Sequence, residues 1–188
     1  MSPAWLRVFS RNKGKALIEF SRQPRIDEII LGFVIDISPN LVLLHRLDWS
    51  TFRMDGYCAL RLIDVKDYRL FDRKSWPSRA IQKLKIRSKK PGKIRLQSWP
   101  ELIEDAARLF PLLTFRRERK FPDACWIGVP LTVTSSLVTY DDLDPKAKWS
   151  GPYCLKMREI TRIDFDAGYE RALALTAPRL PAKKLRRS

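Results

Sequence analysis

The second half of this sequence repeats the first. When Gly32 is aligned with Gly128, the two stretches run forward for 27 positions without a gap and seven pairs are identical. A repeated sequence predicts a repeated supersecondary unit, so we expect one copy at 17–82 and another at 99–177. Two copies are too few for an open solenoid, so either each copy closes its own core or the two share one. The identical pairs are Gly32/Gly128, Leu41/Leu137, Val42/Val138, Leu47/Leu143, Asp48/Asp144, Tyr57/Tyr153 and Cys58/Cys154.

Each copy reads as a series of short β-strands. The stretch 29–37 is rich in β-branched residues, with apolar side chains alternating onto one face. The turn Ser38-Pro39-Asn40 follows, then strands near 41–44, 57–62 and 65–71 separated by a polar loop. Short helices are predicted after Ser75 and Ser98 and over 169–176. The expected fold class is therefore mainly β with short helices (α+β).

The segment from Gly32 to Leu44 resembles the first Sm signature, with its glycine, alternating apolar residues, turn and second strand. The second Sm signature is missing, since Asp55-Gly56 and Gly151-Pro152 are only loosely similar to it. The wider pattern, including residues 160–173, resembles uncharacterised bacterial proteins with a duplicated Sm-like or SH3-like small barrel. This resemblance implies two tandem small barrels, without implying an activity or Sm-type RNA contacts.

The positive charge lies outside the repeats. The chain has 37 Lys and Arg against 21 Asp and Glu, a net charge of +16. The two repeats together are neutral, so the excess belongs to segments that contain no acidic residue. We expect a basic N-terminal arm at 1–16, a basic hairpin or linker at 83–98 and a basic disordered tail at 178–188. Within the first segment, the apolar residues Trp5, Leu6, Val8 and Phe9 leave a short helix open as the alternative to an arm.

Two structures are open for the middle segment. Pro91-Gly92 at its centre is a turn signal, and apolar residues alternate with cations on both sides of it, which favours a basic hairpin. The alternative is a solvated linker.

These basic segments predict a non-catalytic binding protein. Cations without neighbouring carboxylates attract polyanions, above all nucleic acid, and release counterions when they neutralise phosphates. Trp5, Phe9, Trp76 and Trp99 lie near the charge and are candidates to stack on bases. The alternative is a protein-interaction module that binds a partner through a strand edge or an inter-repeat groove. The candidate polyanion-binding residues are Lys83, Lys85, Arg87, Lys89, Lys90, Lys93, Arg95, Lys183, Lys184, Arg186 and Arg187.

No local motif indicates an enzyme, a cofactor or a metal. The sequence has no GxSxG, HExxH, Gly-rich phosphate loop or paired-carboxylate motif. We interpret Asp48 and Asp144 as turn residues that accept backbone hydrogen bonds. The acidic run at 141–144 is interpreted as a solvated turn, because the first repeat does not share it. His45, the single histidine, is interpreted as a strand-end residue.

The expected location is the cytoplasm. The longest apolar run, 29–35, is too short to span a bilayer, and the N-terminus lacks the apolar region of a signal peptide. No integral membrane association is therefore expected. Three cysteines without a CxxC pair argue against disulfides, and the equivalent Cys58 and Cys154 are predicted to be buried.

Overall fold

The computed structural model describes residues 3–24, 26, 28–179 and 186–187. The chain divides into two compact units, Met1–Pro91 and Gly92–Ser188. The division falls between Pro91 and Gly92, inside the basic middle segment. Among the residues described, no helix is long and apolar enough to cross a membrane.

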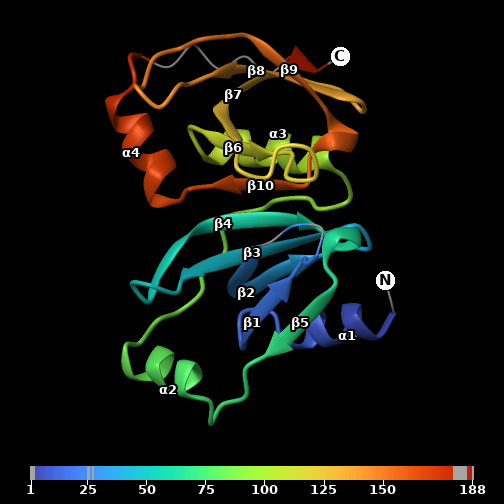
Figure 1. Cartoon of the computed structure of the whole chain (residues 1–188), viewed down its shortest axis with the longest axis vertical. Coiled ribbons are helices and arrows are strands. Elements are labelled where there is room, and N and C mark those ends of the chain that lie inside the picture. Colours follow the sequence, from blue (N-terminus) through green and yellow to red (C-terminus); the bar gives the residue numbers. More distant parts are fainter. Residues whose placement is uncertain (1–2, 25, 27, 180–185, 188) are drawn as a thin grey trace. The chain divides into compact units, whose positions relative to one another are not determined.

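The first unit is a five-stranded antiparallel sheet with two helices (Figure 1). Its strands lie in the order β5-β1-β2-β3-β4. A 3₁₀ turn, η1, separates β4 from β5. The elements are α1 (Pro3–Arg11), β1 (Leu17–Ser21), β2 (Ile29–Ile37), β3 (Leu41–Asp48), β4 (Arg53–Arg61), η1 (Leu62–Asp64), β5 (Asp67–Leu70) and α2 (Trp76–Lys83).

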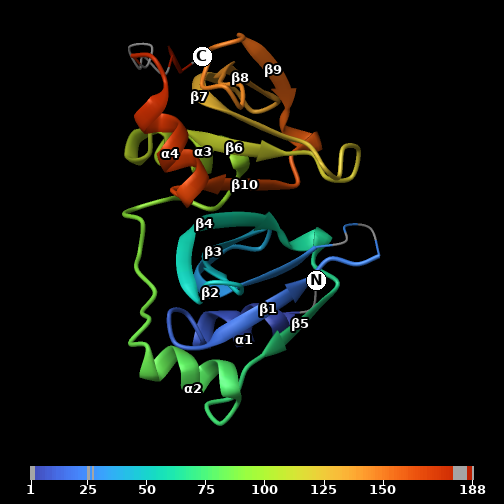
Figure 2. The same ribbon diagram turned by 60° about the vertical axis from the view of Figure 1, so that its left-hand side comes forward.

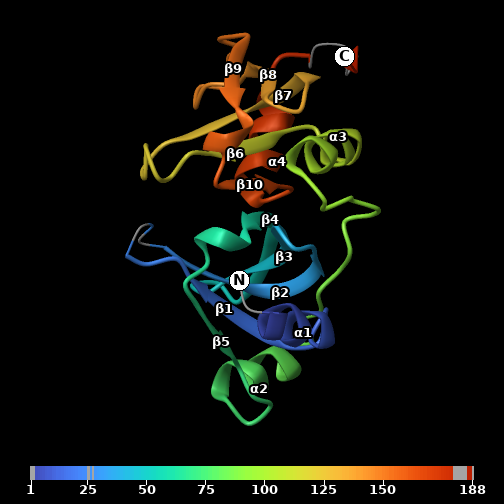
Figure 3. The same cartoon turned by 90° about the vertical axis from the view of Figure 1, so that its right-hand side faces the viewer.

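Alternation along the strands gives this sheet two apolar faces. One face carries Ile18, Phe20 and their even-numbered neighbours, and α1 covers it with the fully buried Phe9. The other face carries Leu17 and Phe33 and packs against α2. Figure 3 shows α1 beside β1 and β2. The expected basic arm at 1–16 is thus corrected: most of it is a helix whose apolar side belongs to the core.

The second unit repeats the same order of elements. Its antiparallel strands lie in the order β10-β6-β7-β8-β9, and helix α3 contacts β6 and β7. A further short strand, β11, runs parallel to β7. The elements are α3 (Trp99–Leu109), β6 (Leu113–Arg116), β7 (Cys125–Val133), β8 (Leu137–Asp142), β9 (Tyr153–Lys156), η2 (Met157–Glu159), β10 (Arg162–Phe165), α4 (Gly168–Thr176) and β11 (Arg186–Arg187).

Local irregularities recur at equivalent positions of the two units. The register of β2 on β3 shifts between Val34 and Asp36, and that of β7 on β8 shifts between Pro130 and Thr132. The turns that follow are also built alike. The backbone N–H of Leu41 donates to Ser38 Oγ at 3.0 Å, and that of Leu137 donates to Thr134 Oγ1 at 3.0 Å.

The presence of glycine at both position 32 and the equivalent position 128 has a steric reason. A Cβ added to Gly32 would lie 2.4 Å from the carbonyl oxygen of His45 on β3. A Cβ on Gly128 would lie 2.1 Å from the carbonyl oxygen of Asp141 on β8. Glycine therefore lets the neighbouring strand approach closely in both units.

The α+β class is confirmed: the fold is mainly β, with four short α-helices in the part described. The sheets are open rather than closed, since no described pairing joins the outer strands β5 and β4 or β10 and β9. The prediction for the cysteines is half right, because Cys58 is buried and Cys154 is exposed.

The middle segment is not a hairpin. Residues 84–98 contain no strand and connect α2 to α3 (Figure 2). It is not a fully solvated linker either, because Ile94 and Leu96 are buried. In the tail, Arg186 and Arg187 pair with Thr132 and Val133, so these two residues are not disordered; 180–185 and 188 lie outside the described residues.

Candidate polyanion-binding surface

The basic segment is fixed to the first unit at the point where α2 ends. Lys85 adopts a left-handed conformation with φ 55°, and the N–H of Ile86 donates to the carbonyl of Ile81 at 3.0 Å. This is the hydrogen bond of a Schellman C-cap. It directs Ile86 into the apolar cluster beneath α2. With Ile86 turned inward, Lys85 and Arg87 on either side of it are exposed.

His45 holds the next part of the segment. The backbone N–H of Lys89 donates to His45 Nδ1 at 3.0 Å, and the imidazole stacks on Tyr57 with ring centroids 4.6 Å apart. Burial, reinforced by the Lys89 charge, lowers the pKa of His45 to about 4. The ring is therefore neutral at pH 7 and can accept this hydrogen bond. His45 is a buried anchor for the basic segment rather than a surface or half-buried strand end.

A hollow of about 310 Å³ lies where this segment meets the α1–β1 loop. Lys13, Lys89 and Lys90 line it, and Ser88 Oγ donates to the carbonyl of Gly14 at 3.4 Å across the junction. Lys13 forms an ion pair with Asp36. Two basic stretches that are far apart in the sequence thus meet at one place on the first unit.

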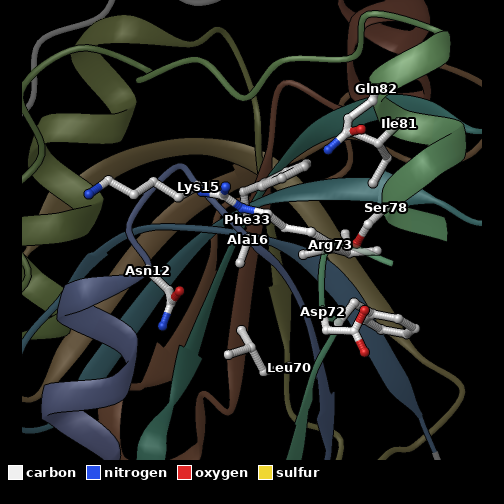
Figure 4. Close-up of a pocket in the computed structure, with 12 residues that line it drawn as sticks. Asn12, Lys15, Ala16, Phe33, Leu70, Asp72, Arg73, Ser78, Ile81 and Gln82 are labelled. Atoms are coloured by element: carbon white, nitrogen blue, oxygen red, sulfur yellow. The ribbon is translucent and has the colours of Figure 1, made fainter. Parts of the chain in front are cut away.

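A larger hollow of about 420 Å³ lies between the α1–β1 loop, the end of β5 and α2. Figure 4 shows Ser78, Ile81 and Gln82 reaching it from α2, Asp72 and Arg73 from the loop before α2, and Asn12 from the end of α1. Its lining also includes Ala16, Leu17, Phe33 and Leu70, so it combines apolar walls with polar and basic groups.

Five of the predicted binding residues belong to the first unit and all five are exposed. They are Lys83, Lys85, Arg87, Lys89 and Lys90. Lys93 is exposed at the start of the second unit. Lys183 and Lys184 lie outside the described residues, and only the backbone of Arg186 and Arg187 is described. The structure thus brings five of the eleven together on one described surface.

Arg95 is not a free cation. Its Nε donates to Asp105 Oδ2 at 2.8 Å, and its guanidinium also contacts Glu101 and Glu104. These carboxylates raise the pKa of Arg95 further above its usual range. These ion pairs could not be predicted from the sequence, because the three acidic residues lie on α3, six to ten residues after Arg95. Arg95 ties the connection to α3, and we remove it from the candidate binding set.

Asp48 and Asp144 serve turns, whereas the interpretation of 141–144 as a single solvated turn was wrong, because Asp141 and Asp142 are the last residues of strand β8 and are half-buried. Asp48 Oδ1 accepts from the N–H of Ser50 at 2.8 Å, and the equivalent Asp144 Oδ1 accepts from the N–H of Lys146 at 2.8 Å. These bonds confirm the interpretation of both aspartates as turn residues. The described part of the chain has no group of His, Cys, Asp and Glu side chains arranged to hold a metal ion.

Only one of the four candidate stacking aromatics is exposed. Phe9 and Trp99 are buried, and Trp5 packs against the first core. The side chain of Trp76 is 56% exposed and lies in a cluster with Trp49, Phe52 and Phe71. We did not predict this cluster from the sequence, because it combines the loop after β3 with the segment from Phe71 to the start of α2. The available signal was the presence of two aromatic residues, Trp49 and Phe52, in an otherwise polar stretch.

Comparison with known proteins gives no match. We compared the chain with models of protein families, with characterised proteins and with solved structures, and none of the three comparisons finds a similar protein.

Proposed function

We propose that this protein is a non-catalytic binding protein whose first unit binds nucleic acid or a related polyanion. The observation that carries the proposal is the anchored, acid-free run of exposed cations from Lys83 to Lys90, beside the Lys13 hollow. Its backbone is held by the cap at Ile86 and by His45. Cations on a fixed backbone can meet successive phosphates without ordering the segment first.

The charge balance supports this assignment to the first unit. Residues 1–91 contain 19 Lys and Arg against nine Asp and Glu, which leaves +10 of the net +16. A surface with this excess attracts phosphate backbones and gains affinity by counterion release. Contacts of this kind position a nucleic acid and carry no base specificity.

We further propose that the two units are copies of one ancestral Sm-like or SH3-like small barrel. The shared order of elements, the equivalent register shifts and the equivalent glycines support a duplication. Because the described sheets are open, each copy would be a partly open barrel. A cytoplasmic location is proposed on the cysteine content, an odd number without a CxxC pair, which suits a reducing compartment.

The test uses two variants of equal charge. One replaces Lys85, Arg87, Lys89 and Lys90 by Gln, and the other replaces Lys120, Lys146, Lys148 and Lys156, which lie on the second unit. Fluorescence anisotropy with labelled DNA and RNA at 150 mM salt then measures the dissociation constants. We expect at least a tenfold loss of affinity in the first variant and less than a threefold loss in the second.

Equal losses would assign the binding to net charge alone and contradict a site on the first unit. Absence of binding by the unaltered protein would contradict nucleic-acid binding altogether. Arg95→Gln is a further control: we expect it to lower the thermal midpoint of unfolding and to leave the affinity unchanged.

The competing function is a protein-interaction module. The observation that favours it is the outer strand β9 of the second sheet, which pairs only with β8 among the described strands of its unit and exposes Tyr153. An extended peptide can add to such an edge by backbone hydrogen bonds. Binding of a protein partner that persists in 0.5 M salt would favour this function over polyanion binding.

A further inference from the structure

The first unit carries a cluster of partly exposed aromatic rings. The rings of Trp49 and Trp76 meet edge to face with centroids 5.1 Å apart, and Phe52 lies 5.6 Å from Trp76. Trp49 also lies 6.5 Å from Phe71. The side chains of the two tryptophans are 46% and 56% exposed. Large apolar rings gathered at a surface are an unusual arrangement and indicate a binding site.

Both tryptophans are presented by turns that hydrogen bonds hold in place. Trp49 follows Asp48, whose carboxylate accepts from the N–H and the hydroxyl of Ser50. Trp76 begins α2 just after a turn in which Asp72 Oδ1 accepts from the N–H of Ser75 at 2.8 Å. The rings are thus held in position before any ligand arrives, which reduces the entropy lost on binding.

Phe52 adds an independent sign of a built site. It adopts a left-handed conformation with φ 53°. This conformation is unfavourable for a bulky residue, and strain of this kind is concentrated at functional sites. In this conformation the Phe52 ring contacts both tryptophans, with its centroid 5.5 Å from that of Trp49 and 5.6 Å from that of Trp76.

Cations lie next to these rings. The guanidinium of Arg69 lies over the Phe71 ring at 4.5 Å from its centroid. Arg73 lines the larger hollow together with Phe71, so this hollow borders the cluster (Figure 4). Helix α2 then leads from Trp76 to Lys83, about 12 Å at 1.5 Å per residue, where the exposed basic run begins.

We propose that Trp49, Phe52, Phe71 and Trp76 form a stacking platform for unpaired bases, so that the ligand of the first unit is single-stranded nucleic acid. Bases stack on the rings, while Arg73 and the cations from Lys83 onward hold the phosphates. This combination of aromatic rings and a basic track is how proteins bind single strands without sequence preference. In a duplex the base faces are already stacked on each other, and the platform gains nothing. The inference rests on the proposed function and names its ligand.

The experiment compares a labelled 12-nucleotide oligo-dT strand with its duplex at equal salt, using the full-length protein. The double variant Trp49→Leu with Trp76→Leu removes the platform. Tyr153→Leu with Tyr169→Leu, two exposed aromatics of the second unit, is the matched control. Because stacking contributes at least about 1 kcal/mol per base, losing two rings lowers single-strand affinity about 30-fold. Duplex affinity and the control variant should change less than twofold.

A third variant tests whether a loss of affinity comes from misfolding rather than from loss of the aromatic rings. Trp49→Phe with Trp76→Phe keeps aromatic faces, so it should retain most of the single-strand affinity. Equal binding of strand and duplex, unchanged in the Leu variant, would overturn the platform and leave the proposed function standing. Loss of both strand and duplex binding in a folded Leu variant would also overturn it. If the unaltered protein binds neither, the proposed function fails first and the platform with it.

Discussion

At the scale of single residues, burial of His45 makes the free energy of unfolding depend on pH. The pKa of its imidazole is lowered to about 4 in the folded protein, against 6.5 in an unfolded chain. Below pH 6.5 the His45 imidazole is protonated in the unfolded state, whereas in the folded state it stays neutral until about pH 4. The free energy of unfolding therefore falls across this window, by about 1–3 kcal/mol.

The measurement is urea unfolding at pH 7 and pH 4.5 for the protein and for His45→Gln. The difference between the two proteins isolates this one group from the carboxylates that titrate nearby. Because the chain has a single histidine, its NMR titration is also unambiguous. A midpoint near 6.5 would contradict the buried, neutral ring.

The two equivalent glycines give a second prediction at this scale. Gly32→Ala and Gly128→Ala each force a methyl group against the backbone of the neighbouring strand. Since carbonyl oxygens of a sheet cannot move aside cheaply, each change should destabilise the protein by about 1–3 kcal/mol. Chemical denaturation measures it, with Lys156→Ala on the exposed side of β9 as a neutral control. Changes below about 0.5 kcal/mol at both glycines would contradict the close approach.

At the scale of elements, the end of α2 is stabilised less than it could be. Lys85 occupies the left-handed position of the cap, which glycine adopts without steric penalty. Lys85→Gly should therefore raise the free energy of unfolding by about 0.5–1 kcal/mol. Arg87→Gly, in the extended part of the segment, should bring no gain. A loss of stability in Lys85→Gly would show that the left-handed cap is not formed in solution.

Comparing the predicted with the observed helices and strands shows which elements can be predicted from the sequence. The strand 29–37 was predicted with its observed bounds, because β-branched residues and an adjacent Ser-Pro-Asn turn delimit it. A short helix was one of two alternatives for the N-terminal segment, but its packing into the core was not predicted, since nothing local showed that Phe9 is buried. The hairpin at 83–98 was wrong because alternating apolar residues fit any extended chain that rests on a core, paired or not.

The candidate site was predictable only in part. The basic run could be located from the sequence, because the distribution of charged residues along the chain can be counted directly. That count could not separate Lys89 from Arg95: in the fold the side chain of Lys89 is exposed to solvent, whereas that of Arg95 contacts the carboxylates of α3. The aromatic cluster was harder still, because β4 and β5 separate Trp49 and Phe52 from Phe71 and Trp76 in the sequence.

At the scale of the whole molecule, two units with the same order of elements differ in charge, and we propose that the first binds polyanions. The most direct test is the salt dependence of single-strand binding by the full-length protein and by the variant with Gln at 85, 87, 89 and 90. Each phosphate contact contributes about 0.7 to the slope of log K against log salt for a single strand. We expect a slope shallower by about 3 in the variant. An unchanged slope would show that these cations do not contact phosphates and would rule out polyanion binding by this segment of the first unit.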